Sequence, residues 1–147
     1  MKPYMWQFVA ERDKALFAVV EAMVDKFPQN VVLWNDKRGR PIELSCHIFA
    51  RAFAALFSEL ECVDGYFFKR FEHSWLVTQD YGLIDPYPVG MAGGPILMHD
   101  HPTSYTRPAL LYTPDKRAMP KVYARIGFDE FARAVAHATD LLRAARA

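Results

Sequence analysis

The sequence predicts an α+β fold in which helices pack on one antiparallel sheet. Two observations carry this prediction. Apolar residues recur at helical spacing near both ends of the chain and again within residues 45–60. Between the second and third of these segments lie short runs of β-branched and aromatic residues separated by turn residues, as in antiparallel strands. The length of 147 residues suits one hydrophobic core, so residues 1–147 are expected to form a single domain.

The first helix is expected over residues 5–27. Its apolar residues recur every three or four positions, its charged segment 11–14 is available to face water, and Pro28 ends it. A short strand is expected at residues 31–34. The polar segment NDKRGRP at 35–41 is expected to be a loop because it holds Gly and Pro. The apolar positions of the first helix are Val9, Leu16, Val20, Met23 and Phe27.

The second helix is expected from about Ser45 to Leu60, with Ser45 as its N-cap. Apolar residues surround almost its whole circumference, which is typical of a helix buried in a core rather than one lying on a surface. Cys46 falls in its first turn. The apolar stripe of this helix consists of Phe49, Phe53, Leu56 and Leu60.

Strands are expected in the middle of the chain, and the last helix is expected over residues 128–145. The apolar residues of that helix form one stripe at helical spacing, from Phe128 through Phe131 to Leu142. The candidate strands are 62–69, 73–78 and 82–85, with weaker candidates at 95–98, 109–113 and 121–126.

Composition and charge exclude several classes of partner. Hydrophobic residues make up 52% of the chain and charged residues 24%, as in an ordinary globular protein. The formal net charge is +1 and no basic run is present, so no nucleic-acid partner is expected. No apolar stretch approaches the roughly 20 residues of a membrane span, and the charged N-terminus is unlike a signal peptide. We therefore expect a cytoplasmic protein, or one exported without a cleaved signal.

A histidine and an aspartate fall on neighbouring candidate strands. The QDYG segment at 79–82 has turn chemistry, so a hairpin folded there puts His73 nearly opposite Asp85, with side chains roughly 5 Å apart at Cβ. Asp85 could then accept a hydrogen bond from one ring nitrogen of His73, fix its tautomer and leave the other nitrogen free. Such a pair is either a core pair or part of a catalytic site, depending on whether the chain supplies a nucleophile.

Cys46 is the candidate nucleophile. By itself it also fits a small apolar residue in a buried helix. The first turn of a helix, however, presents unpaired N–H groups and the positive end of the dipole, and an imidazolium partner would favour the thiolate further. Those N–H groups could also stabilise an oxyanion. Cys62 has no base placed for it, and both cysteines are expected to be free thiols.

These residues resemble the transglutaminase-like branch of the papain-like cysteine hydrolases. The resemblance covers roughly residues 40–90. It rests on Cys46 opening an apolar helix, on the segment HSW at 73–75 and on the segment IDP at 84–86. In one departure, Ser45 stands where the family often has Gly. The resemblance implies a papain-like core, with the cysteine-bearing helix packed on an antiparallel sheet.

The resemblance also implies the roles of the site residues. Cys46 would be the nucleophile, His73 the general base and acid, and Asp85 the group that orients His73. A helper to the oxyanion hole usually comes from upstream in this family, for which Trp34 or Asn35 is the candidate here. The expected function is thiol acyl chemistry on an amide or ester bond through a thioester acyl-enzyme, with no metal or organic cofactor.

The expected substrate is a peptide or a small amide or ester. Hydrolysis is the default outcome because water needs no second binding site, and transfer to an amine shares the first half of the reaction. A protein partner is possible. An alternative from another class is a binding or assembly protein that keeps the fold without turnover.

Three further residue sets have open interpretations. His99 and His101 would face the same way on an extended segment, which suits metal ligation, or they belong to a polar loop. Trp75 shares a face with His73 under strand periodicity, so it either shields the pair from water or belongs to the core. Helix geometry turns His47 about 100° from Cys46, so it is expected to be a poor base that could still touch a substrate.

Overall fold

The computed structural model describes residues 11–27, 31–80, 82–87, 96–99 and 112–146. Within that part of the chain, no helix is both long enough and apolar enough to span a bilayer. The elements are α1 (Glu11–Lys26), β1 (Val32–Asn35), β2 (Pro41–Glu43), α2 (Cys46–Leu56), β3 (Glu61–Phe67), β4 (Phe71–Val77), β5 (Gly82–Asp85), β6 (Ile96–His99), β7 (Tyr112–Pro114) and α3 (Lys121–Arg146).

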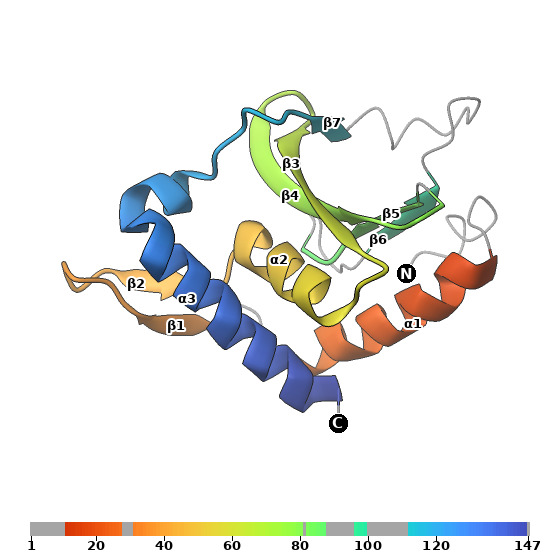
Figure 1. Cartoon of the computed structure of the whole chain (residues 1–147), viewed down its shortest axis with the longest axis horizontal. Helices are drawn as coiled ribbons and strands as arrows, with labels where there is room; N and C mark the ends of the chain where they lie inside the picture. The colour runs from red at the N-terminus through yellow and green to blue at the C-terminus, as the bar shows by residue number, and fades with distance from the viewer. Residues whose placement is uncertain (1–10, 28–30, 81, 88–95, 100–111, 147) are drawn as a thin grey trace.

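The strands form a five-stranded antiparallel sheet in the order β6-β5-β4-β3-β7 and a separate hairpin of β1 and β2. Figure 1 shows the sheet curling over α2, with α1 and α3 on the other side of that helix. The expected α+β class is therefore confirmed, and the cysteine-bearing helix lies between the sheet and the two flanking helices. Strands β3 to β5 lie within two residues of the expected bounds.

Helix α2 begins where its sequence predicts and ends earlier. Ser45 is the N-cap, and its hydroxyl oxygen accepts a hydrogen bond from the N–H of Ile48 (3.4 Å). The helix ends at Leu56 rather than near Leu60, because Phe57 takes extended backbone angles. The Leu60 N–H donates to the Phe57 carbonyl in the turn that follows (3.0 Å), and both side chains still reach the core. Apolar burial thus extends past the end of the helix itself.

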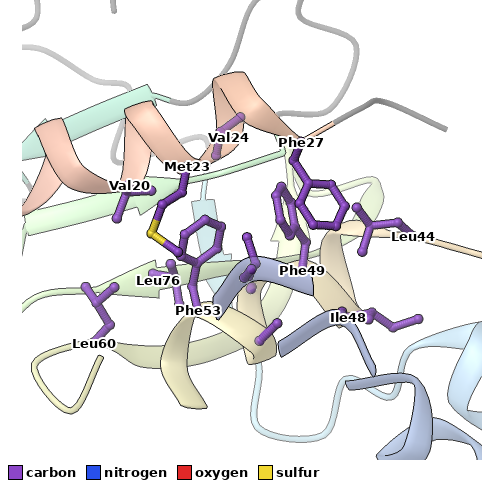
Figure 2. Packing of buried hydrophobic residues seen from close by; sticks show 14 of the residues in the cluster. Val20, Met23, Val24, Phe27, Leu44, Ile48, Phe49, Phe53, Leu60 and Leu76 are labelled. Carbon is purple, nitrogen blue, oxygen red and sulfur yellow. The ribbon is translucent and has the colours of Figure 1, made fainter. Parts of the chain in front are cut away.

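The largest core cluster holds α2 against α1. Figure 2 shows the side chains of Met23 and Phe27 on α1 pointing toward Phe49 and Phe53 on α2. The ring centroid of Phe49 lies 5.2 Å from that of Phe27 and 5.0 Å from that of Phe53. Burial of each such ring contributes about 1.5–3 kcal/mol. This packing makes α2 a rigid support for the residues at its first turn.

The prediction that the charged segment 11–14 faces water is wrong for Asp13. That carboxylate is only 4% exposed, and its Oδ2 accepts a hydrogen bond from the Thr78 hydroxyl (3.1 Å). The Thr78 Oγ1 in turn accepts the Gly82 N–H (2.9 Å). A contact across 65 positions of the chain ties α1 to the β4–β5 turn, which helical periodicity cannot reveal.

The segment 35–41, expected to be a loop, contains the turn of a hairpin and the start of β2. Asn35 pairs with Pro41, and Trp34 pairs with Ile42. The Asp36 carboxylate organises the turn, since its Oδ1 accepts the backbone N–H groups of residues 38 and 40, each at 2.9 Å. A side-chain bond of this kind favours a turn over an open loop.

The weak strand prediction for residues 121–126 is wrong, because this segment is helical and forms the first part of α3. The ring of Tyr123 packs edge-on against that of Phe131 in the same helix, with ring centroids 5.1 Å apart. The two parts of α3 meet at Gly127, whose φ of 83° favours glycine. Phe128, expected in the apolar stripe, is 68% exposed just after this break, whereas Phe131 and Leu142 are buried.

Candidate active site

His73 and Asp85 are brought together by the register of β4 and β5. Leu76 pairs with Ile84. Continuing that register by one residue puts Asp85 opposite Trp75, so His73 is its diagonal neighbour on the same face of the sheet. His73 Nε2 lies 2.8 Å from Asp85 Oδ2, and both side chains have no exposed surface. The expected contact is present, but Asp85 lies two residues from the position directly opposite His73.

Asp85 accepts three hydrogen bonds from the part of the chain that the structure describes. Its Oδ2 accepts the ring N–H of His73 and the hydroxyl of Tyr112 (2.6 Å), and its Oδ1 accepts the backbone N–H of Tyr87 (3.1 Å). A fully buried carboxylate needs such compensation, since desolvation of an unpaired charge is costly. Burial, and then the Asp85 charge, raises the pKa of Tyr112 far above its usual range, so the phenol stays protonated and donates.

Tyr112 was not among the sequence candidates. It belongs to β7, and pairing of that strand with β3 places Tyr112 opposite Phe67. The signal available in the sequence was only a weak strand at 109–113. The Tyr112 hydroxyl reaches Asp85, 27 positions away in the chain, only because β7 pairs with β3.

Replacing Tyr112 by phenylalanine is expected to lower the free energy of unfolding by about 2 kcal/mol, because a buried charged acceptor loses one donor. Urea unfolding followed by circular dichroism measures the change. Tyr123→Phe is the matched control, since that half-buried hydroxyl makes no hydrogen bond to a described residue. Equal stability of the two variants would contradict a role for the Tyr112 hydroxyl in holding Asp85.

His73 has one ring nitrogen engaged and one free. Its Nε2–H donates to Asp85. Its Nδ1 is the one buried side-chain nitrogen or oxygen, within the described part of the chain, that has no hydrogen-bond partner. The ring is enclosed by aromatic neighbours and stacks on Trp75 with centroids 6.1 Å apart. Native structures rarely leave such an atom unpaired, which makes Nδ1 a candidate for proton transfer.

Cys46 also interacts with the His73 ring. Burial by itself lowers the pKa of His73, but the hydrogen bond with Asp85 and the interaction with Cys46 raise it to about 9. Because Asp85 occupies Nε2, the interaction with Cys46 falls to Nδ1. The sulfur does not make a hydrogen bond with Nδ1 by the usual geometric criteria.

The two cysteines differ strongly in acidity. Burial raises the pKa of the Cys46 thiol, but hydrogen-bonding interactions with His47 and His73, and the charges of both rings, outweigh it and lower the pKa to about 6. Burial raises the pKa of the Cys62 thiol to about 12. Both cysteines are free thiols. At neutral pH these shifts favour the thiolate of Cys46, at the first position of α2, and the protonated thiol of Cys62.

The candidate helpers of the oxyanion hole lie on β1. Trp34 packs against α3, where its indole N–H donates to Glu130 (3.0 Å) and its ring meets His137 edge-on at 5.7 Å. That N–H is therefore already engaged. Asn35 ends β1. The first-turn N–H groups of α2, on Cys46 and the residue after it, have no carbonyl within the helix to which they could donate.

Trp75 belongs to the core and also forms a wall of the site. It is 1% exposed, lies in a second cluster with Leu83 and Tyr112, and stacks on His73. His47 was expected to turn away from Cys46. Instead, the structure places its buried ring close enough to lower the pKa of the Cys46 thiol.

The alternative interpretation of His99 and His101 is a metal site. Among the described residues, no group of three or more histidine, cysteine, aspartate or glutamate side chains could hold a metal ion. His99 ends β6, and His101 lies outside the described residues. A metal site built on these two histidines stays a prediction.

No protein-family model matches the chain, and neither a curated protein nor a solved structure matches it. The site is therefore defined by its own geometry. It consists of a thiol of lowered pKa at the first turn of a buried helix, an imidazole with one buried nitrogen that no described residue bonds, and a carboxylate that holds the other nitrogen.

Proposed function

We propose that this protein is a cysteine-nucleophile hydrolase or acyltransferase that acts on an amide or ester bond through a thioester acyl-enzyme. Cys46 is the nucleophile, His73 the general base and acid, and Asp85 the orienting group. The observation that carries the proposal is the buried Nδ1 of His73, which has no hydrogen-bond partner among the described residues. The other ring nitrogen is held by Asp85, and the Cys46 thiol that interacts with the ring has a lowered pKa.

The first half-reaction forms the thioester. The Cys46 thiolate attacks the carbonyl carbon of the substrate, a C–S bond forms, and the carbonyl oxygen becomes an oxyanion. The N–H groups at the first turn of α2 are oriented to stabilise that charge. When the tetrahedral intermediate collapses, the C–N or C–O bond breaks, and His73 Nδ1–H gives its proton to the leaving amine or alkoxide.

The second half-reaction restores the enzyme. Neutral His73 takes a proton from water or from an acceptor amine at Nδ1, and the oxygen or nitrogen so activated attacks the thioester carbonyl. The C–S bond breaks, Cys46 leaves as the thiolate, and His73 remains as the imidazolium. Asp85 keeps the proton of His73 on Nε2 throughout, because this N–H stays hydrogen-bonded to the carboxylate. These steps use side chains and backbone N–H groups of the chain, the substrate, and water or an acceptor amine.

The fold supports a finer assignment within this class. The order Cys, His, Asp along the chain, with the cysteine on a buried helix and the other two residues on neighbouring antiparallel strands, matches what the transglutaminase-like resemblance implies. A papain-like core is therefore part of the proposal. The substrate class that goes with it is a peptide or a small amide or ester.

The pH dependence of iodoacetamide labelling, read by peptide mass spectrometry, tests the proposal. The pKa of Cys46 is lowered, so labelling should persist as the pH falls and be halved near pH 6. At pH 7 about nine-tenths of Cys46 and about 10⁻⁵ of Cys62 would be thiolate, so Cys62 is an internal control. Turnover, unlike labelling, should also decline above about pH 9, where His73 loses the proton that it donates.

A free-cysteine profile would contradict the proposal. If Cys46 is half-labelled only above pH 8, no thiolate–imidazolium pair exists at neutral pH. The chain would then be better described as a binding or assembly protein without turnover.

A further inference from the structure

A pocket opens to solvent where the turn of the β1–β2 hairpin meets α3, the helix that lies beside the hairpin in Figure 1. We call it the hairpin pocket. Its volume is about 340 Å³, which falls in the range of small-molecule sites. The proposed triad contributes no residue to it, so its role is independent of the proposed function. The cations that line the hairpin pocket are Lys37, Arg38, Arg40 and Arg125.

The hairpin pocket has a surplus of positive charge. Its lining holds four cations but only two carboxylates, Asp36 and Glu130, so its formal charge is +2. Glu130 is also engaged by residues outside the pocket. Its Oε2 accepts the indole N–H of Trp34 (3.0 Å), and its Oε1 lies 3.7 Å from Arg133 Nη1. The charge of Glu130 is therefore shared with a fifth cation, and the surplus in the pocket remains.

Asp36 holds two of the guanidinium groups in place. Its side chain is only 8% exposed, and its Oδ2 lies 3.1 Å from Arg40 Nε and 3.5 Å from Arg125 Nη1. Its Oδ1 accepts two backbone N–H groups of the turn. The one from Arg40 is the largest cause of the lowered pKa of this carboxyl, which therefore stays charged at neutral pH. The hairpin turn and α3 thus present their arginines from a common anchor.

Most donors of the four cations are left without a protein acceptor. Arg40 uses Nε, so both of its Nη groups lack a hydrogen bond to a described residue. The Nη1 of Arg125 is beyond the usual hydrogen-bond distance from Asp36. The side chains of Lys37 and Arg38 are exposed and form neither a hydrogen bond nor an ion pair with the described part of the chain. What the hairpin pocket lacks is an anion.

We propose that the hairpin pocket binds a small organic dianion, either a phosphate monoester or a dicarboxylate. A guanidinium group presents parallel N–H donors that match the oxygens of a phosphate or a carboxylate. Two negative charges balance the formal charge of the lining. The volume leaves room for an organic part beside the anionic group, and Ile126, which is half-buried, offers that part an apolar contact.

The test is isothermal titration calorimetry of the whole chain with phenyl phosphate, succinate and acetate at pH 8. A phosphate monoester is a dianion at that pH because its second pKa is about 6. Low ionic strength keeps the screening of exposed charges small. At least one of the two dianions should bind with a stoichiometry of one, about tenfold or more tighter than acetate, because the second charge meets a second cation.

Arg38→Gln and Arg125→Gln should each weaken binding of that dianion by about tenfold, since each removes a charged donor. Arg38→Gln changes only an exposed side chain and keeps the backbone N–H that Asp36 accepts. Arg143→Gln is the matched control. It makes the same change of charge on α3 at a residue outside the pocket, where Arg143 pairs with Asp140 (2.7 Å), and it should bind as the wild-type protein does.

Two results would overturn the proposal. One is that neither dianion binds more tightly than acetate. The other is that all three variants lose affinity equally, which would indicate attraction to the general surface charge rather than to the pocket. If Arg125→Gln does not fold, as judged by circular dichroism, Arg38→Gln decides alone: a loss supports the site and wild-type affinity refutes it. The tighter of phenyl phosphate and succinate identifies which of the two dianions the pocket takes.

Discussion

Replacing Cys46 by alanine is expected to abolish acylation of the protein by a small activated ester such as p-nitrophenyl acetate, with a loss of at least about 10³-fold. Cys46 is the thiol with a lowered pKa, whereas burial keeps Cys62 protonated. The measurement is the burst of p-nitrophenolate in stopped flow, together with the intact mass of the protein, which should increase by one acetyl group. A small acyl group suits a cysteine that is partly buried.

Cys62→Ala is the matched control for this experiment. It removes the second thiol on β3 and should keep the burst and the acetylated mass, because no imidazole acts on that sulfur. A burst of wild-type size in Cys46→Ala, or an acetyl group located on Cys62 by peptide mapping, would contradict the assignment of the nucleophile.

Replacing His73 by glutamine is expected to slow acylation of Cys46 by about 10²- to 10⁴-fold at pH 7. The variant loses the proton carrier and one of the two rings that favour the thiolate, so the pKa of Cys46 should rise and the pH profile should shift upward. The amide of glutamine can still donate to Asp85, which limits damage to the buried pair. The measurement is the acylation rate against pH in the same stopped-flow assay.

His137→Gln is the matched control, because it makes the same change on α3, where His137 packs against Trp34. Near-UV circular dichroism of both variants verifies that the core around Trp75 is intact. If folded His73→Gln acylates at the wild-type rate, His73 is a core histidine paired with Asp85, and the proton must be carried by another group.

Much of the fold follows from patterns along the chain. The turn residues of 79–82 placed the β4–β5 hairpin, and the hairpin register brought His73 within reach of Asp85. The apolar surface of residues 46–57 predicted a buried helix, and Ser45 predicted its first turn, where Cys46 lies. These features are local, since each depends on residues within about one hairpin or one helix, and local patterns are what periodicity and turn chemistry record.

Other features depended on side-chain contacts that local patterns do not record. The strand pattern of 121–126 was overridden by packing of Tyr123 on Phe131 across the break at Gly127. Asp13 was expected in water, but its carboxylate accepts a hydrogen bond from Thr78, which is 65 positions away in the chain. In the first case packing within α3 outweighed the local strand preference, because propensity differences are small beside the free energy of burial. In the second case a hydrogen bond to a distant strand replaced contact with water.

The sequence by itself determined the α+β class, the helix that begins at Cys46 and the hairpin that pairs His73 with Asp85. Only the tertiary structure decided the acidity of the thiol, because that depends on burial and on His47 and His73 lying beside the same sulfur. The tertiary structure also decided that the Tyr112 hydroxyl donates a hydrogen bond to Asp85. A strand or helix is specified by neighbours in the chain, whereas the charge state of a buried group is specified by its neighbours in space.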